Sequence, residues 1–108
     1  MSTWDELIKA VGPISSIRDL FLKARSAGLN VAELMNNYLR SEPLFNFIGL
    51  EFVEIGDGFV RAVFPYKREI LRRGGMVHGG VIMTVIDTVL GTAVMTVNDG
   101  VDQYTAEL

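Results

Sequence analysis

The 108-residue sequence contains no cysteine and a single histidine. Without cysteine the chain has no disulfide bonds, no zinc sites built from thiolates and no cysteine nucleophiles. One imidazole leaves little from which to build a transition-metal site, so we expect no bound metal. The lack of cysteine is typical of a reducing compartment, and the length fits one small domain.

Basic residues are outnumbered. The 13 acidic and 10 basic side chains give a net charge of -3. A nucleic-acid binder that acts through counterion release needs a basic face, so nucleic acid is not an expected partner. The chain starts with the acidic residues Asp5 and Glu6 and lacks the positively charged start of a secretory signal. We therefore expect a cytoplasmic globular protein.

Charge is nearly absent from the segment Gly79 to Val97, where Asp87 is the one charged residue. As a helix this segment would be about 28 Å long, close to the hydrocarbon thickness of a bilayer. A carboxylate in the middle of a membrane span costs about 2.5–3.5 kcal/mol, and a lone span would leave the rest of the chain without a shared core. We therefore expect a central helix under a sheet and no membrane partner.

Apolar residues at helical spacing predict three short helices in the first third of the chain, over 4–11, 16–28 and 30–41. Ser16 and Asn30 are placed to cap the second and third helices, because Ser and Asn side chains accept hydrogen bonds from the first turn. Each apolar stripe is interpreted as packing surface rather than as a membrane-surface helix, since the polar faces show no basic excess.

After Pro43 the pattern changes to period two. Leu50, Phe52 and Glu54 are assigned to one side and Glu51, Val53 and Ile55 to the other. Gly56-Asp57-Gly58 is a turn signal, and 59–64 supply a returning strand. The pattern predicts a β-hairpin. A further strand is expected to begin at Gln103.

The segment from Tyr66 to Arg73 is the strongly basic stretch of this acidic chain. Four cations against Glu69 give it a charge of +3: Lys67, Arg68, Arg72 and Arg73. Most such runs are solvated loops, but this loop is also the natural place for an anionic ligand.

Two features of the long apolar segment have both a structural and a functional interpretation. Asp87 is either a solvent-edge residue, a paired structural charge or a reactive group. In His78-Gly79-Gly80, the glycines either relieve strain at a loop-to-helix turn, or leave N–H groups open to an oxyanion or a polarised carbonyl.

The spacing of these features limits how they can act together. Asp87 lies eight residues beyond Gly79, about 12 Å along one helix, so the two cannot both touch one reacting carbon. Two chains related by a two-fold axis could form such a site. A seam of small residues, Gly80, Thr84, Thr88, Thr92 and Thr96, is a plausible contact between the two helices.

The motif Gly75-Met76-Val77-His78-Gly79-Gly80, followed after six residues by Asp87, resembles the signature of hotdog-fold acyl-CoA thioesterases of the phenylacetic-acid-degradation type. The resemblance covers 44–108 and includes Phe47–Glu54 as the first strand. It implies an α+β hotdog fold, a long central helix wrapped by an antiparallel sheet. The expected organisation is a helical extension over 1–43 and the hotdog domain over 44–108, assembled as a dimer or a dimer of dimers.

The resemblance also implies roles for individual residues. The backbone N–H of Gly79, next to Gly80, holds the thioester carbonyl. The Asp87 carboxylate, from the opposite subunit, activates water as a general base or attacks directly as nucleophile. Thr105 matches the residue that orients the water, and His78 shapes the loop and the acyl pocket. No cofactor is implied beyond the coenzyme A of the substrate.

The sequence departs from this family's pattern in two places. Arg72 stands where many relatives carry an Asn that assists at the carbonyl, so we expect Arg72 to contact the coenzyme phosphates, together with Lys67, Arg68 or Arg73. The family's sheet continues for two strands beyond the one beginning at Gln103, so we expect an incomplete copy of a longer protein. The alternative function is an acyl-CoA-binding sensor without catalysis, in which the helices of 1–43 transmit the signal.

Overall fold

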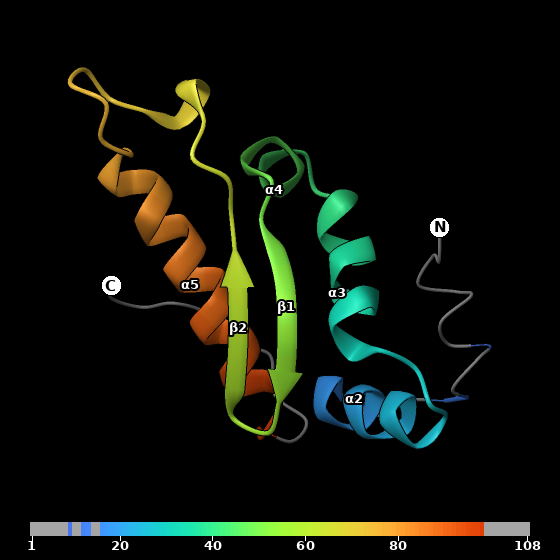
Figure 1. Cartoon of the computed structure of the whole chain (residues 1–108). Coiled ribbons are helices and arrows are strands. Elements are labelled where there is room, and N and C mark those ends of the chain that lie inside the picture. The colour runs from blue at the N-terminus through green and yellow to red at the C-terminus, as the bar shows by residue number, and fades with distance from the viewer. Residues whose placement is uncertain (1–8, 10–11, 14–15, 99–108) are drawn as a thin grey trace.

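The computed structural model describes Lys9, residues 12–13 and residues 16–98, and forms an α+β arrangement around one hairpin (Figure 1). The elements follow in the order α2 (Ile17–Ser26), α3 (Val31–Arg40), α4 (Pro43–Ile48), β1 (Glu51–Gly56), β2 (Phe59–Val63), the short 3-10 helix η1 (Arg68–Ile70) and α5 (Gly79–Met95). Figure 1 shows α3 beside β1, α5 beside and behind β2, and α2 near the hairpin turn. The predicted α+β class is confirmed.

The predicted caps of α2 and α3 are confirmed. The Ser16 side chain accepts a hydrogen bond from the Asp19 N–H at 3.0 Å. The Asn30 side chain accepts one from the Glu33 N–H at 3.1 Å. The first predicted helix, over 4–11, lies outside the described residues except for Lys9.

The start of the first strand was predicted wrongly. The family resemblance placed Phe47 in that strand, whereas the structure places it in α4 and begins β1 at Glu51. Pro43 suits the first turn of a helix because its φ is already helical and its missing N–H is not needed there. Gly49, with a φ of 80°, ends the helix in the left-handed conformation.

The hairpin pairs antiparallel but does not keep strict alternation. A register shift between Phe52 and Glu54 inserts a β-bulge into β1. The bulge turns Ile55 toward the core and leaves Glu54 outside, where its carboxylate lies 3.6 Å from the Arg61 guanidinium. The simple period-two assignment of Ile55 and Val53 to one face was therefore wrong.

One core joins the hairpin to helices on both sides. Phe52 is 2% exposed and shares an apolar cluster with Leu50, which directly precedes β1, and with residues of α3, α4 and α5, namely Ala32, Leu39, Ile48 and Val85. The helices before residue 43 therefore pack directly against the hairpin, and the division into 1–43 and 44–108 stays a prediction.

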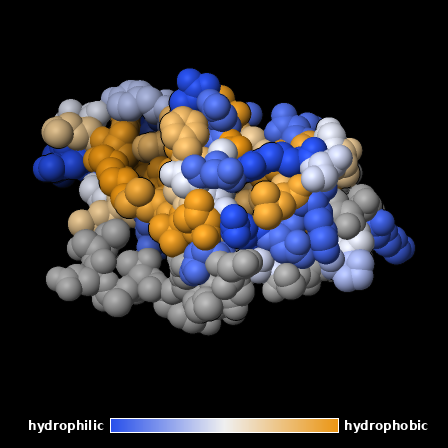
Figure 2. Space-filling model, turned by 90° about the horizontal axis from the view of Figure 1, so that it is seen from below, coloured by the Kyte–Doolittle hydropathy of each residue, from blue (hydrophilic) through white to orange (hydrophobic). Residues whose placement is uncertain are grey.

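The other flank of α5 is apolar and exposed. Its large apolar side chains are between 42% and 58% exposed: Ile82, Met83, Ile86, Leu90 and Val94. Figure 2 shows apolar surface gathered around a hollow on one side of the molecule, opposite the more polar side. Among the described residues, no helix is long and apolar enough to cross a membrane. The predicted third strand, from Gln103, lies outside the described residues.

Candidate functional site at the start of helix α5

The basic loop is held in a defined hairpin-like shape. The Tyr66 hydroxyl donates to the Gly75 carbonyl at 2.6 Å, and the Arg72 N–H donates to the Met76 carbonyl at 2.7 Å. Gly74 and Gly75 both have positive φ, 96° and 82°, which favours glycine at the tip of the turn. The cations of the loop are therefore carried on an ordered scaffold.

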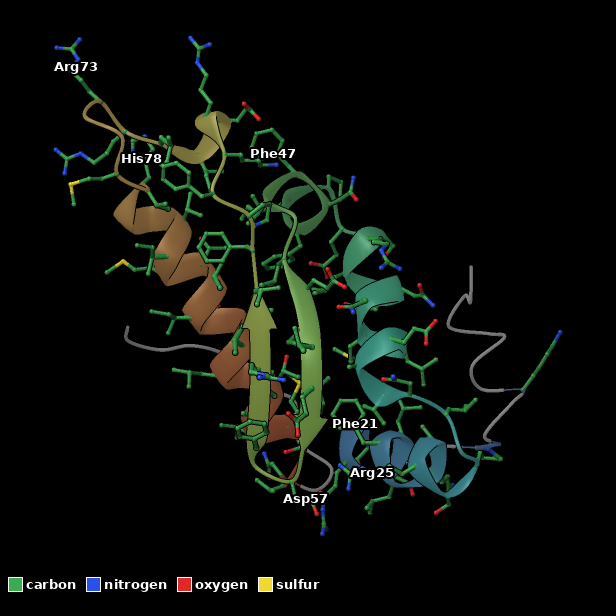
Figure 3. The ribbon with its side chains drawn as sticks, in the orientation of Figure 1. Phe21, Arg25, Phe47, Asp57, Arg73 and His78 are labelled. Carbon is green, nitrogen blue, oxygen red and sulfur yellow. The ribbon has the colours of Figure 1, made fainter. Side chains whose placement is uncertain are left out.

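The base of this loop is fixed against the start of α5. The His78 N–H donates to the Ile70 carbonyl at 3.0 Å, and Leu71 and Val77 form an antiparallel bridge. Ile70 is 2% exposed and anchors the loop in the interior. These contacts bring the predicted basic stretch and the predicted His-Gly-Gly motif to the same end of the molecule, where Figure 3 shows Arg73 and His78.

The four cations of the loop are not equivalent. The Lys67 ammonium donates to the Phe47 carbonyl and lies 4.6 Å from the centroid of the Phe47 ring. Arg68, Arg72 and Arg73 are exposed, and their guanidinium groups form no hydrogen bond or ion pair with any described residue. The three arginines are therefore open to an anion, while Lys67 joins the loop to α4.

The first residues of α5 leave their main chain open. His78 is the N-cap but makes no side-chain capping hydrogen bond, and His78, Gly79 and Gly80 are all exposed. The N–H groups of Gly79 and Gly80 donate to no residue in the described part of the chain. Together with the helix dipole, these N–H groups make an electropositive end, beside the three arginines.

Nothing within the described fold requires glycine at these two positions. Neither Gly79 nor Gly80 has a positive φ, and a Cβ built on either one meets no atom within 4 Å. Relief of backbone strain, the structural interpretation of this motif, therefore finds no support. Glycines without a conformational or steric role in their own fold are typical of places where a ligand or another chain approaches the main chain closely.

Asp87 lies on the same helix but is not brought to this site within one copy. It is half-buried in the middle of α5, and the helix runs unbroken from Gly79 to Met95. Asp87 lies eight residues beyond Gly79, which corresponds to about 12 Å of rise.

The predicted seam of small residues is exposed along only part of its length. Thr92 and Thr96 are 5% and 2% exposed, and the Thr96 hydroxyl accepts a hydrogen bond from the Gly58 N–H at 2.7 Å. A four-residue spacing drifts by about 40° per step around a helix, so the later threonines wind into the core. The open part of the seam comprises Gly80, Thr84 and Thr88, beside Asp87.

Thr105, the predicted water-orienting residue, lies outside the described residues. The sequence analysis missed Tyr66 and Ile70 as supports of the basic loop, and no spacing signal marks them. No group of His, Cys, Asp and Glu side chains in the described part of the chain could hold a metal ion.

The chain is similar to several archaeal proteins that carry the name "putative esterase". It is 36% identical to one from Saccharolobus solfataricus over 96 residues, which are 89% of this chain and 56% of that protein. It is 40% identical to a second protein of that organism over 80 residues, 74% of this chain and 53% of the relative. A relative from Sulfurisphaera tokodaii is 40% identical over 67 residues, 62% of this chain and 50% of that protein.

This chain therefore spans about half the length of the curated relatives that it matches. No family model matches the sequence, and no solved structure matches it. The comparisons associate the chain with proteins named as esterases, and the chemistry of its own site is argued below from the residues.

Proposed function

We propose that this chain hydrolyses an acyl-CoA-type thioester to a carboxylic acid and a free thiol, in a hotdog-fold enzyme whose sites are shared between two subunits. The observation that carries the proposal is the start of α5. There, two glycines that the fold itself does not require leave N–H groups open beside three unengaged arginines. The names of the relatives, which describe esterases, agree with hydrolysis of an acyl ester.

In this mechanism the thioester carbonyl oxygen accepts a hydrogen bond from the Gly79 N–H. Negative charge develops on that oxygen as water attacks the carbonyl carbon, and the N–H together with the helix dipole stabilises it. Asp87 of a second copy accepts the proton of the attacking water. The carbon–sulfur bond then breaks, and the proton passes to the leaving thiolate.

Two further residues are predicted to act in this step. Thr105 would orient the water, and His78, which caps α5 and is exposed, would border the acyl group. Direct attack by Asp87 as nucleophile is the other route open to the same carboxylate.

The coenzyme part of the substrate is assigned to the arginines. Phosphate groups favour guanidinium partners, which donate two parallel hydrogen bonds. Arg68, Arg72 and Arg73 are available for this, whereas Lys67 is engaged with Phe47. Arg72, at the position of the family's Asn, would then serve the phosphates rather than the carbonyl.

The test is thiol release from short, long and aromatic acyl-CoAs by the protein and its Asp87→Asn variant. Loss of a general base costs about 10²–10⁴-fold in rate, so the variant should lose hydrolysis while it keeps its fold and its oligomeric mass. Asp57→Asn, which alters an exposed carboxylate at the hairpin turn, is the control and should retain activity. Hydrolysis that survives Asp87→Asn would refute the mechanism, and tight acyl-CoA binding without turnover would establish the sensor instead.

A further inference from the structure

A buried amide on α3 binds the main chain of β1. Asn36 is 7% exposed, and its Nδ2 donates to the Phe52 carbonyl oxygen at 2.9 Å. Its Oδ1 accepts a hydrogen bond from the Phe52 N–H at 2.6 Å. One side chain therefore satisfies both main-chain groups of one strand residue, as a neighbouring strand would.

The position of Phe52 in the hairpin explains why these groups need a partner. Phe52 lies opposite Ala62 of β2, yet both its N–H and its C=O are directed to Asn36, on the side away from β2. In an antiparallel ladder, the N–H and C=O groups of a non-hydrogen-bonded pair point away from the partner strand. A further strand beside β1 would normally bond these groups, and here Asn36 bonds them instead. Figure 1 shows α3 lying alongside β1 on that side.

An open strand edge is a template for pairing with another chain. β1 has features that favour such pairing, because Val53 is apolar and 45% exposed and Phe52 and Ile55 are strand-forming residues. The bulge at Phe52 and Glu54 is a partial defence, but the main-chain groups of Phe52 would be free beside it without the amide.

We propose that Asn36 acts as a substitute strand, which closes the edge of β1 against pairing with β1 of a second copy of this chain. Removal of the amide leaves two main-chain groups without a partner and releases α3 from the edge, so that the β1 edge of another copy can satisfy these groups when α3 moves aside. The helices before residue 43 thereby keep self-association away from this edge. If the shared site proposed above holds, the productive two-fold pairing is confined to the side of α5.

The test is the mass of Asn36→Leu in solution, measured by light scattering after size exclusion. Leucine has a side chain of similar shape and removes both hydrogen bonds, so we expect at least a doubling of mass relative to the unaltered protein. Asn37→Leu is the matched control, because Asn37 is the next residue and bonds the exposed Arg40 side chain instead. Asn37→Leu should keep the original mass.

A second change separates strand pairing from association caused by unfolding. Lysine on an edge strand opposes pairing, so Val53→Lys added to Asn36→Leu should restore the original mass. Asn36→Asp keeps the acceptor for the Phe52 N–H and loses the donor, and should give an intermediate mass. Unchanged mass in a folded Asn36→Leu, or association that Val53→Lys does not reverse, would overturn the proposal. These readouts do not depend on thioester hydrolysis, so they stand whether or not the proposed function holds.

Discussion

Replacing Gly79 with proline removes one N–H and changes little else in the described structure. Gly79 is the first residue of α5, where proline is well tolerated because its φ is helical and its N–H is not used by the helix. The preceding residue, His78, has a ψ of 132°, which is the extended conformation required before proline. A Cβ at Gly79 meets no atom within 4 Å.

The expected effect is on catalysis and not on folding. Loss of one donor to the oxyanion lowers kcat by about 10²–10³-fold, or about 2.7–4 kcal/mol of transition-state stabilisation. The melting temperature should stay the same or rise slightly, because proline restricts the unfolded chain. Gly79→Ala is the comparison, since alanine keeps the N–H and adds only a Cβ. A loss of kcat in Gly79→Pro that exceeds the loss in Gly79→Ala is due to the missing N–H, whereas an equal loss in both would be due to blocked approach of the substrate.

The assay is thiol release at saturating acyl-CoA for the protein and both variants, with thermal unfolding followed by circular dichroism. The decisive quantity is kcat, because an interaction made in the transition state affects kcat more than KM. If Gly79→Pro retained the kcat of the unaltered protein at an unchanged melting temperature, the Gly79 N–H would have no role in the reaction.

The same variant tests whether the site is shared between two copies. Gly79→Pro and Asp87→Asn each destroy both sites of a homodimer. A heterodimer of the two variants keeps one intact site, built from Gly79 of one chain and Asp87 of the other. Random exchange of an equal mixture gives about half heterodimers with one site in two intact, so about a quarter of the activity should return. A mixture that has exchanged subunits and stays inactive would refute the shared site.

Two further predictions concern the charged residues. Arg73→Gln should raise KM for acyl-CoA severalfold, because an exposed ion pair contributes about 0.2–1 kcal/mol, and should leave KM for the matching acyl-pantetheine unchanged. Equal KM shifts with both substrates would argue against phosphate binding. Lys67→Gln should lower the melting temperature, because it breaks the contact with Phe47. Burial of the Tyr38 phenol and its hydrogen bond with the Glu42 carboxylate raise the pKa of Tyr38 above the usual value of about 10. Because the folded state then holds this proton more tightly than the unfolded chain, stability should fall as the pH rises above about 10, and Tyr38→Phe should weaken that fall in denaturation curves measured from pH 9 upward.

The parts of the fold that local chemistry determines could be predicted from the sequence. Ser16 and Asn30 cap their helices because short polar side chains reach the N–H groups of the first turn, and nothing distant is needed. The bulge in β1 could not be predicted in this way. It places Ile55 between two apolar clusters, one of which includes residues of α2, so its cause lies in tertiary packing.

The candidate site also combines features that can be predicted from the local sequence with contacts that depend on distant residues. The basic loop and the glycine pair were identifiable from composition and spacing, but the separate role of Lys67 depends on Phe47, twenty residues earlier in the chain. Asn36 carried no sequence signal, because its partner is the main chain of Phe52 and any residue type offers the same N–H and C=O. Side-chain hydrogen bonds to a distant main chain are therefore the contacts of this structure that are hardest to predict from residue patterns.

The faces of α5 argue that the unit built around this helix is larger than the described residues. A helix packed on one side is usually amphipathic, with polar side chains toward water. α5 packs against the hairpin through Val85, yet its opposite flank carries Met83 and Leu90, which are 53% and 58% exposed, and its remaining side carries the half-buried Asp87. An apolar flank of this kind is typical of a surface that another polypeptide covers. In the proposed two-fold pairing, a second copy would cover this flank and present its Gly79 to Asp87, so the proposal accounts for both the apolar character of the helix and its one carboxylate.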